Sequence, residues 1–594
     1  MINIDLQNKV IEAIEKIYNE KVEQNLVQIQ QTRKEFVGDF TLVVFPFVKL
    51  LKKSPEIIAN EIGEYIKQNM SEVSNFNVIK GFLNFVLTDS FWNNFLLSNF
   101  NSNSLFEISK NNNSILIEYS SPNTNKPLHL GHIRNNLLGF SVAEILKANG
   151  NKVIKVNLIN DRGIHICKSM IAWQKFGNDE TPEKSELKGD FLVGKYYVKF
   201  DQEYKKQIAE LISSSLTEDE AKQKAPIMLE AQEMLRKWEQ NDAEVRNLWQ
   251  KMNSWVYKGF DETYKKMGVD FDKLYYESET YLLGKEIVEK GLQNGTLYRK
   301  DDSSVWADLT GDGLDEKLLL RSDGTSVYMT QDIGTAILRH NEFEPSKMIY
   351  VVGNEQNYHF DVLKLILGKM QYSWSQNLFH LSYGMVELPE GKMKSREGTV
   401  VDADNLIDEM IQTAKEMSEE LGKLQGLSDS EKEEVYRIIG LGALKYFLLK
   451  VDPKKNMTFN PKESIDFNGN TGPFIQYTGV RIKSIIRKAK ENGIEIEKIK
   501  ISTDFSLNAE KILLQNLYQF TNVVDEASRL LSPSIIANYT YELAKDFNQF
   551  YHENSILNAD NEETRNSRLA LTFLVGKTIE NSLKLLGIEV PERM

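Results

Sequence analysis

The sequence predicts a multidomain α/β protein, and three observations support this prediction. The chain has 594 residues, more than a single hydrophobic core normally holds together. The apolar, partly β-branched run 115–119 indicates a buried strand, and a polar loop ends it. Leu138, Val142, Ile145 and Leu146 then follow at helical spacing. A strand, a loop and a helix start in this order are typical of nucleotide-binding α/β domains.

The composition indicates a soluble, cytoplasmic protein. Hydrophobic residues make up 41% of the chain, which is enough for globular cores. The single cysteine, Cys167, excludes intramolecular disulfides and a multi-cysteine zinc site, as expected in a reducing cytosol. The N-terminus has no basic region followed by an apolar stretch, and no run of residues is apolar over the length of a membrane span. We therefore expect no membrane partner.

Residues 1–108 are predicted to form a small α+β domain. An amphipathic helix at the start places Val10 and Ile14 on its apolar face. The β-rich run 81–87 follows, before the linker 99–113, which is rich in asparagine and serine.

Residues 109–455 are predicted to form a Rossmann-like α/β domain with a helical insertion at about 172–255. The insertion is rich in charged, helix-favouring residues, and apolar side chains such as Trp238 and Trp255 recur along it.

Residues 456–594 are predicted to form an α-helical bundle, because apolar periodicity continues through most of this part. The net charge of −13 argues against a nucleic-acid partner for the chain as a whole. The run 481–490, however, carries five cationic side chains and no acidic one. Its candidate phosphate contacts are Arg481, Lys483, Arg487 and Lys488. The stretch upstream adds Lys445, Lys450, Lys454 and Lys455. The alternative is a solvated helix face with its counter-charges elsewhere.

The most informative segment is 119–132, at the predicted step from strand to helix. His129 and His132 flank a glycine there. Three interpretations are open: a helix-start pair with ordinary hydrogen bonds, two metal ligands, or two donors to nucleotide phosphates. The metal interpretation is disfavoured because the neighbourhood has no cysteine and little carboxylate to complete a zinc site. In the nucleotide interpretation, Gly131 lets a purine lie against the backbone.

A second segment, 391–399, is a glycine-flanked basic loop after the strand-like stretch 381–388. Lys392, Lys394 and Arg396 are suited to contact a triphosphate and to neutralise the charge that develops on it. Basic loops are usually solvated surface loops, and this alternative holds for the segment taken alone. Its occurrence downstream of the histidine pair in an α/β domain favours nucleotide chemistry.

The two segments resemble the two signature motifs of class I aminoacyl-tRNA synthetases, and their details resemble the arginyl-tRNA synthetases. Ser-Ser-Pro-Asn at 120–123, followed by Lys126-Pro127 and the histidines, is that family's form of the first motif. The resemblance continues in order through residues 328–332, 353–359, 470–477, 586–588 and 591–594. It covers nearly the whole chain apart from the insertion.

The resemblance implies an arginine–tRNA ligase that uses ATP and Mg²⁺. Such an enzyme converts L-arginine to arginyl-adenylate and then transfers it to the 3′-terminal ribose of tRNA(Arg). By the same resemblance, 1–108 is an appended tRNA-binding domain, 109–455 is the catalytic domain and 456–594 binds the anticodon. The family is commonly monomeric. The alternatives are another class I synthetase and a non-catalytic tRNA-binding paralogue.

The resemblance also implies the residues of the site, with no protein metal ligand among them. The implied arginine-binding residues are Glu118, Asn123, His132, Tyr328, Asp332 and Gln356. The implied ATP-binding residues are His129, Gly131, His132, Asp161, Gly163, Lys392, Met393, Lys394 and Ser395. Asp332 is expected to accept two N–H bonds from the guanidinium. The plain alternatives are a helix-start cap for Asp332 and a strand-end surface charge for Glu118.

One departure from the family pattern concerns the second motif. Lys394 stands at its third position instead of serine, and Ser395 stands where the second lysine belongs. In the family, a lysine just before the first motif is thought to compensate for this loss, and Lys126 has that place here. We expect either Lys126 or Lys394 to supply the missing charge. The implied catalytic residues are Lys126, His129, His132, Lys392 and Lys394.

Overall fold

The structure is a computed structural model. It describes residues 2–33, 35–102, 104–107, 110–389, 401–421, 424–502, 506–507 and 509–594. The chain divides into two compact units. Unit 1 comprises Met1–Glu107, Arg481–Thr521 and Glu542–Ile579, and unit 2 comprises Ile108–Val480, Asn522–Tyr541 and Glu580–Met594.

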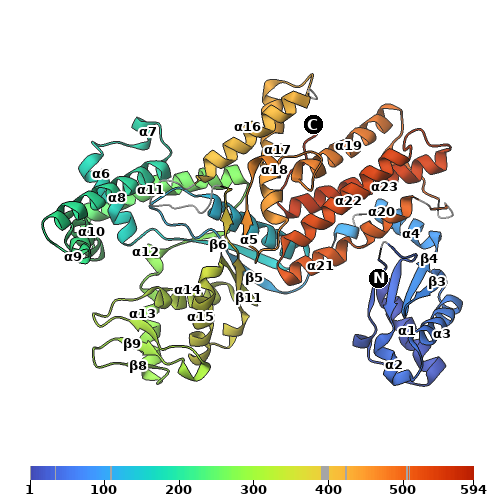
Figure 1. The fold of residues 1–594 in the computed structure, drawn as a ribbon, viewed down its shortest axis with the longest axis horizontal. Coiled ribbons are helices and arrows are strands. Elements are labelled where there is room, and N and C mark those ends of the chain that lie inside the picture. Colours follow the sequence, from blue (N-terminus) through green and yellow to red (C-terminus); the bar gives the residue numbers. More distant parts are fainter. Residues whose placement is uncertain are drawn as a thin grey trace. The chain divides into compact units, whose positions relative to one another are not determined.

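Unit 1 contains a four-stranded antiparallel sheet, with α1 and α3 packed beside it (Figure 1). The strand order is β1 (Ile29–Gln31), β2 (Phe40–Val43), β4 (Phe82–Leu87), β3 (Val73–Ile79). The helices of this part are α1 (Ile2–Tyr18), α2 (Phe45–Leu51), α3 (Pro55–Asn69) and α4 (Asp89–Phe100). The predicted amphipathic helix is confirmed, because Leu6, Val10 and Ile14 of α1 are fully buried.

The C-terminal residues are helical as predicted, but they are shared between the two units and do not form a third. Helix α20 (Glu510–Tyr518) belongs to unit 1. Gln515 of this helix donates from Nε2 to Oδ1 of the buried Asp39 (2.5 Å), and the Tyr518 ring packs edge-on against Trp92 at 5.8 Å between centroids. Helix α20 therefore completes the core around the N-terminal sheet. Apolar periodicity along α20 could not reveal that partner.

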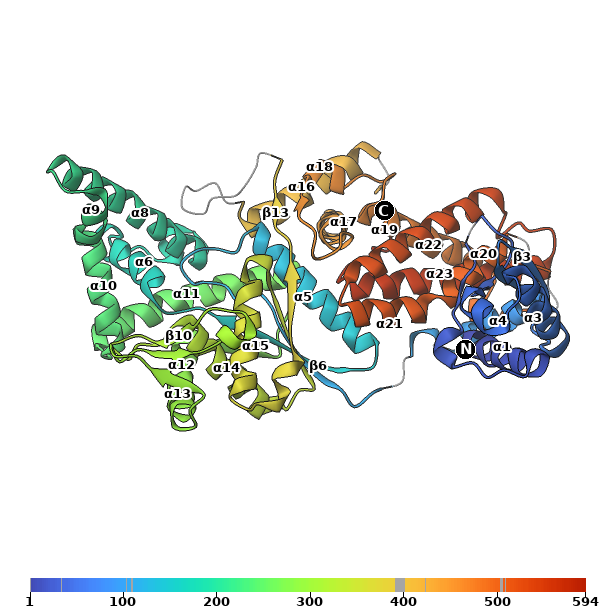
Figure 2. The ribbon, with the colours of Figure 1, turned by 60° about the horizontal axis from the view of Figure 1, so that its bottom comes forward.

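Unit 2 is built on a five-stranded parallel sheet (Figures 1 and 2). The strand order is β12 (Leu378–Tyr383), β11 (Lys347–Gly353), β5 (Ser114–Glu118), β6 (Lys152–Ile159), β7 (Lys273–Tyr276). From the central β5, the chain passes through α5 (Leu130–Ala148) to β6, while β11 pairs with the other side of β5. This arrangement leaves a crevice at the carboxyl ends of β5 and β11, where open α/β sheets bind ligands.

The predicted strand and helix around the first motif are confirmed. Leu138 and Val142 of α5 pack with Ile117 of β5 on one face of the sheet. On the other face, Leu116 joins a separate core with Ile333 of α14. Alternate residues of β5 thus serve two hydrophobic layers, as expected of a strand buried on both faces.

The predicted helical insertion is confirmed and extends beyond 172–255. Its helices are α6 (Ile164–Phe176), α7 (Pro182–Ser185), α8 (Gly189–Ser213), α9 (Glu218–Lys224), α10 (Pro226–Glu239) and α11 (Ala243–Met267). Together they connect β6 to β7, and α8 to α11 lie side by side (Figure 2). The predicted apolar Trp238 is buried among them.

A smaller substructure between β7 and β12 was not anticipated from the sequence. Its elements are α12 (Glu277–Thr280), α13 (Leu283–Gln293), β8 (Leu297–Arg299), β9 (Val305–Ala307), β10 (Lys317–Leu320), α14 (Tyr328–Phe343) and α15 (Asn357–Lys369). The three short strands form an antiparallel sheet in the order β10-β9-β8. Helices α13 and α14 approach so closely that a Cβ at Gly284 would collide with the Thr330 carbonyl. This packing fixes the start of α14, which carries predicted site residues.

The remaining elements flank the second motif or follow it. They are β13 (Val386–Glu387), α16 (Ala403–Leu421), α17 (Asp429–Leu449), β14 (Met457–Thr458), α18 (Pro461–Ser464), α19 (Gly472–Glu491), α21 (Phe520–Leu530), α22 (Pro533–Glu553) and α23 (Glu562–Leu585). Lys445, in the upstream basic stretch, is buried and donates to the Gly587 carbonyl (2.5 Å), and burial lowers its pKa to about 8. Lys445 is therefore structural and does not extend the basic surface. Within the described part of the chain, every helix is too short or too polar to traverse a lipid bilayer.

Candidate active site

The first motif begins with a strained turn directly after β5. Ser120 and Ser121 have φ angles of 78° and 45°, a left-handed conformation that residues other than glycine seldom adopt. The Ser120 N–H donates to Oδ1 of Asn135 in α5 (2.5 Å), and the Ser121 N–H donates to Oδ1 of Asn157 in β6 (3.0 Å). Neighbouring elements therefore hold the turn in place at the carboxyl end of the sheet.

Asn135 also ties together the ends of the central strands. Its Nδ2 donates to the Val351 carbonyl in β11 (2.7 Å) and to the Tyr383 hydroxyl at the end of β12 (3.2 Å). No pattern in the sequence had pointed to Asn135. A polar side chain on the buried face of a helix was the one available signal.

His129 and His132 form the N-terminal cap of α5. The Gly131 N–H donates to Nδ1 of His129 (3.1 Å), and the His129 N–H donates to Nδ1 of His132 (3.2 Å). Because both Nδ1 atoms accept, each neutral ring carries its proton on Nε2. Burial, aided by the charge of Lys126, lowers the pKa of His129 to about 3 and holds that of His132 well below its usual value. At neutral pH, the pair offers two uncharged N–H donors.

A cavity of about 340 Å³ opens beside the two histidines. It is lined by Ser120, Ser121, Lys126, His129, Gly131, His132, Asn135, Val351, Val352, Tyr383, Met385 and Val386. A Cβ at Gly131 would come within 3.0 Å of Cε1 of His129, so the glycine leaves room for the imidazole that caps the helix. The predicted contact of Gly131 with a purine stays a prediction.

A second cavity, of about 230 Å³, shares Lys126 and His129 with the first and also contains Asp402. Burial raises the pKa of Asp402 to about 6. The Leu130 N–H donates to the Val401 carbonyl (3.2 Å), so the chain that follows the second motif lies beside the first motif. The second-motif residues with predicted roles are Lys392, Met393, Lys394 and Ser395, and they lie outside the described residues.

The predicted arginine-binding residues Tyr328, Asp332 and Gln356 lie at the starts of α14 and α15. Tyr328 is the first residue of α14 and is 73% exposed, and Asp332 follows one turn later. Gln356 is exposed in the short turn that leads into α15. Oδ2 of Asp332 lies 2.5 Å from Nε2 of His359 in α15. His359 had no predicted role, and its contact orients Asp332 while Oδ1 of that carboxylate keeps its accepting capacity.

Glu118, predicted as a second arginine ligand, already has a partner. It is 6% exposed and forms an ion pair with Arg339 of α14, and its Oε1 accepts a hydrogen bond from the Ser121 hydroxyl (2.9 Å). A buried pair that loses one member leaves an uncompensated charge, which is strongly destabilising. Glu118 thus connects β5 with the Ser121 turn and with α14, and its predicted contact with arginine stays a prediction.

A different acidic side chain, that of Glu277, lies close enough to Asp332 for their charges to interact. Glu277 is the first residue of α12, directly after β7. Burial raises its pKa to about 7; the charge of Arg162 opposes this shift, and the charges of Asp161 and Asp332 add to it. Among the described residues, its carboxylate has no hydrogen-bond or ion-pair partner. No local pattern had distinguished Glu277 from other surface acids.

Asp161 and Gly163, both predicted to contact ATP, lie between the end of β6 and the start of α6. The Asp161 carboxylate is fully buried and accepts hydrogen bonds from the Ser278 N–H (2.8 Å), the Ser278 hydroxyl (2.7 Å) and the Tyr257 hydroxyl (2.8 Å). Asp161 thus connects α11 and α12 to the end of β6, and its predicted contact with ATP stays a prediction. Gly163, with φ of +100°, begins α6 and does not line the cavity beside the histidines. Asn123 is exposed next to this region, where its backbone bridges that of Asn160.

The four cationic residues predicted to contact tRNA lie on the unit 1 part of α19. Arg481 is hydrogen-bonded to Asn548 and lies over the Tyr551 ring, 5.2 Å from its centroid. Lys483 and Arg487 are half-buried, and Lys488 is exposed. These placements do not decide whether the residues contact tRNA, which remains a prediction.

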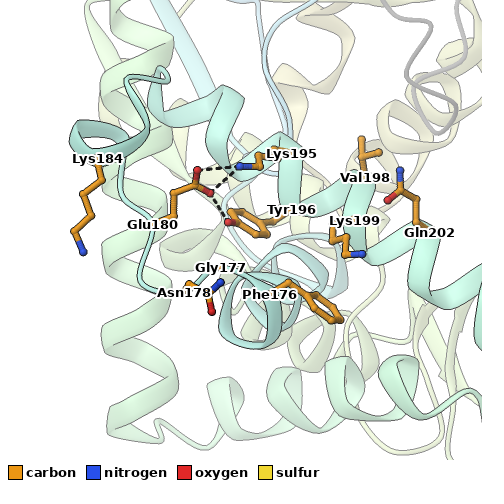
Figure 3. A pocket seen from close by; sticks show the side chains of 10 residues that line it. All are labelled: Phe176, Gly177, Asn178, Glu180, Lys184, Lys195, Tyr196, Val198, Lys199 and Gln202. Atoms are coloured by element: carbon orange, nitrogen blue, oxygen red, sulfur yellow. Dashed lines mark hydrogen bonds and ion pairs between the residues drawn. The ribbon is translucent and has the colours of Figure 1, made fainter.

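A larger cavity, of about 840 Å³, lies in the insertion between the end of α6 and α8 (Figure 3). Its cationic residues are already engaged: Glu180 accepts from Lys195 (2.9 Å) and from Tyr196, and Lys199 pairs with Glu203 (2.7 Å). No residue with a predicted role lines it. Volume alone therefore does not mark the site of chemistry, and we place that site at the histidine pair.

Comparisons with known proteins identify the family of the chain. Three family models match in order: the N terminal domain of arginyl tRNA synthetase at residues 5–87, the catalytic domain of class I (R) tRNA synthetases at 95–460, and the DALR anticodon binding domain at 475–594. The chain is 60% identical to the arginine–tRNA ligase of Phocaeicola vulgatus over 602 residues, with 99% of each chain covered. It is 59% identical to that of Bacteroides thetaiotaomicron over 589 residues, with 98% of each covered.

Solved structures show the same fold. The arginyl-tRNA synthetase of Thermus thermophilus aligns with all of this chain at a TM-score of 0.79 and 23% identity. That of Plasmodium falciparum aligns at a TM-score of 0.77 and 20% identity. The three matched models and the full-length identity to bacterial relatives show that the chain belongs to the arginyl-tRNA synthetase family.

Proposed function

We propose that the chain activates L-arginine with ATP and transfers it to the 3′-terminal ribose of tRNA(Arg). The observation that carries this proposal is the pairing of two uncharged N–H donors, His129 and His132, with an acidic region at Asp332. Uncharged donors suit phosphate oxygens, whereas paired carboxylates suit a guanidinium. Both lie at the end of the sheet where such folds bind ligands.

The arginine side chain would be held by charge. Oδ1 of Asp332 accepts from the guanidinium, while His359 holds Oδ2 at 2.5 Å. Glu277 supplies the second negative charge, and binding of a cation favours its ionised form. Asn123 and Gln356, both exposed, are the proposed contacts of the α-amino group. A neutral or shorter side chain would leave these carboxylates unpaired, and this penalty gives selectivity.

Adenylate formation needs alignment more than proton transfer. A carboxylate oxygen of arginine attacks the α-phosphorus, and the bond from that phosphorus to pyrophosphate breaks. No general base is required, because the arginine carboxylate is already ionised at neutral pH. The Nε2–H groups of His129 and His132 donate to phosphate oxygens, and their geometry is set by the backbone before ATP binds.

The remaining charge would come from lysines and from Mg²⁺. Lys126 lines both cavities at the first motif, and Lys392 and Lys394 of the second motif are the other proposed phosphate contacts. Mg²⁺ would help to neutralise the charge of the phosphates.

The tRNA would bind through phosphate contacts that include Arg481, Lys483, Arg487 and Lys488. Such contacts would weaken steeply with added salt. The protein is proposed to act as a monomer in the cytoplasm.

An aminoacylation assay with total tRNA and each of the twenty amino acids tests this function. We expect charging with arginine alone, and loss of that charging in Asp332→Asn at subsaturating arginine. Charging with another amino acid would overturn the proposed substrate. No charging by the folded protein would instead support a non-catalytic paralogue.

A further inference from the structure

Arg134, two residues after His132 on α5, has a buried side chain with an unusual set of partners. It is 2% exposed, and among the described residues no carboxylate lies within ion-pair distance of it. Burial lowers its pKa to about 10. Burial of a guanidinium without an ionic partner costs free energy. The hydrogen bonds of the Arg134 side chain must therefore have a structural role that offsets this cost.

Arg134 donates to four backbone carbonyls in two separate segments. Nη1 donates to Gly384 (2.6 Å) and Met385 (2.9 Å), and Nη2 donates to Pro453 (3.3 Å) and Lys455 (2.8 Å). The rigid fork of an arginine can satisfy both segments at once, whereas the ammonium of a lysine is a single point.

The two segments are also bound to each other. The Gly384 N–H donates to the Pro453 carbonyl (2.9 Å), and the Met457 N–H donates to the Met385 carbonyl (3.0 Å) at the start of the β13–β14 pair. They lie so close that a Cβ at Gly384 would come within 2.5–2.6 Å of the backbone of Lys455 and Asn456. The glycine and the arginine therefore secure the same contact.

This contact forms one wall of the nucleotide cavity. Met385 and Val386 line the cavity on one side, and His129 and His132 line it from the start of α5. Arg134 does not line the cavity itself, but it lies on α5 and binds the segment that carries Met385. The distance between the histidines and that segment thus depends on Arg134.

We propose that Arg134 is a positioning residue for ATP, which sets the width of the nucleotide cavity by holding residues 384–385 against α5. Arginine recognition does not depend on it, because Asp332, Glu277 and Gln356 lie on α14, α12 and the turn before α15. The proposal rests on the proposed activation of arginine by ATP, and ATP binding alone provides a readout that does not depend on that activity.

Steady-state kinetics of Arg134→Gln and Arg134→Lys test the proposal. Displacement of one cavity wall should raise the KM for ATP by about tenfold or more in Arg134→Gln, since small misplacements have large effects on bound geometry. The KM for arginine should stay within about twofold of the wild type. The KM for ATP of Arg134→Lys should lie between those of the wild type and Arg134→Gln, because one ammonium reaches fewer of the four carbonyls. Equilibrium dialysis with ATP alone should show the same order of affinities.

A second variant perturbs the same wall without touching Arg134. Gly384→Ala should also weaken ATP binding more than arginine binding. Circular dichroism and thermal unfolding establish that each variant is folded, and Arg134→Lys decides the question if Arg134→Gln does not fold. Two results would show that Arg134 only stabilises the fold. One is an equal rise of the KM for ATP and the KM for arginine, and the other is unchanged ATP binding in the folded Arg134 variants.

Discussion

The two halves of the active site are built in opposite ways. In the nucleotide half, backbone N–H groups donate to Nδ1 of His129 and His132 and hold both rings in place. These hydrogen bonds set the tautomer, so each ring presents an Nε2–H group. In the amino-acid half, Tyr328 is 73% exposed, Gln356 is exposed, and Asp332 is held by one side-chain contact. The nucleotide half is thus preorganised, whereas the amino-acid half is open and acidic.

The difference follows from the charges of the two ligands. Uncharged imidazoles can be buried at modest cost and still donate to phosphates, so this half can be complete before ATP arrives. Two carboxylates close together repel each other, and Glu277 shows the effect as a pKa raised to about 7. The negative charge of the amino-acid half is therefore balanced only when a cation binds. The four substitutions below test this comparison.

The largest effect is expected from Asp332→Asn. The variant removes the carboxylate that faces the guanidinium, and loss of one member of a charged hydrogen-bonded pair costs about 4 kcal/mol, or roughly a thousandfold in affinity. The KM for arginine should rise accordingly, whereas the KM for ATP should change little. Asp361→Asn, at an exposed position of α15, is the matched control. A similar rise in both KM values would contradict the separation of the halves.

His129→Asn should act on the other half. Asparagine is a good N-cap, so α5 should keep its stability, but the variant loses the Nε2–H donor. Removal of one preorganised donor to a developing charge typically lowers kcat by about a hundredfold. We expect that loss with an unchanged KM for arginine and a similar melting temperature. His340→Asn, in the last turn of α14, controls for loss of a histidine elsewhere. A lower melting temperature with normal kcat would leave His129 as a structural cap.

Lys126→Ala tests which lysine compensates for the altered second motif. We expect kcat to fall by about tenfold or more, because a positive charge beside the phosphates is lost. Lys152→Ala, at an exposed position at the opposite end of the sheet, should have no effect. Turnover within a few-fold of wild type in Lys126→Ala, together with a large loss in Lys394→Ala, would assign the role to Lys394.

Local patterns in the sequence predicted those parts of the site that depend on neighbours in the chain. The strand 115–119, the turn after it and the helix from His129 follow from apolar periodicity and turn residues, and all three are observed. Asp332 lies one helical turn after Tyr328 in α14. In each case, the partners lie within a few residues or in the next element.

Partners far apart in the chain could not be predicted in this way. The sequence does not show that Arg339 forms an ion pair with Glu118, 221 positions away. Nor does it show that Ser278 donates hydrogen bonds to the Asp161 carboxylate, 117 positions away. For this reason, the structural partners of two acids expected to face ligands could not be predicted. Glu277 was missed for the converse reason, since only the three-dimensional structure shows that its carboxylate has no partner among the described residues.

The smallest effect is expected from Glu277→Gln, and it depends on pH. With a pKa of about 7, the Glu277 carboxyl is mainly protonated at pH 6 and mainly ionised at pH 8, and only the ionised form attracts the guanidinium. The KM for arginine should therefore fall by about fivefold from pH 6 to pH 8 in the wild type, as expected when one carboxyl ionises near its ligand. Glu277→Gln should abolish this dependence and resemble the wild type at pH 6.

Glu279→Gln, at an exposed position of α12, should retain the wild-type profile. The histidines should add no step between pH 6 and pH 8, because the pKa of His129 is about 3 and that of His132 is also far below its usual value. A pH dependence of the KM for arginine that persists in Glu277→Gln would place the titrating group elsewhere. In that case, the acidic half would rely on Asp332 alone, and the contrast with the neutral, preorganised histidines would rest on one carboxylate.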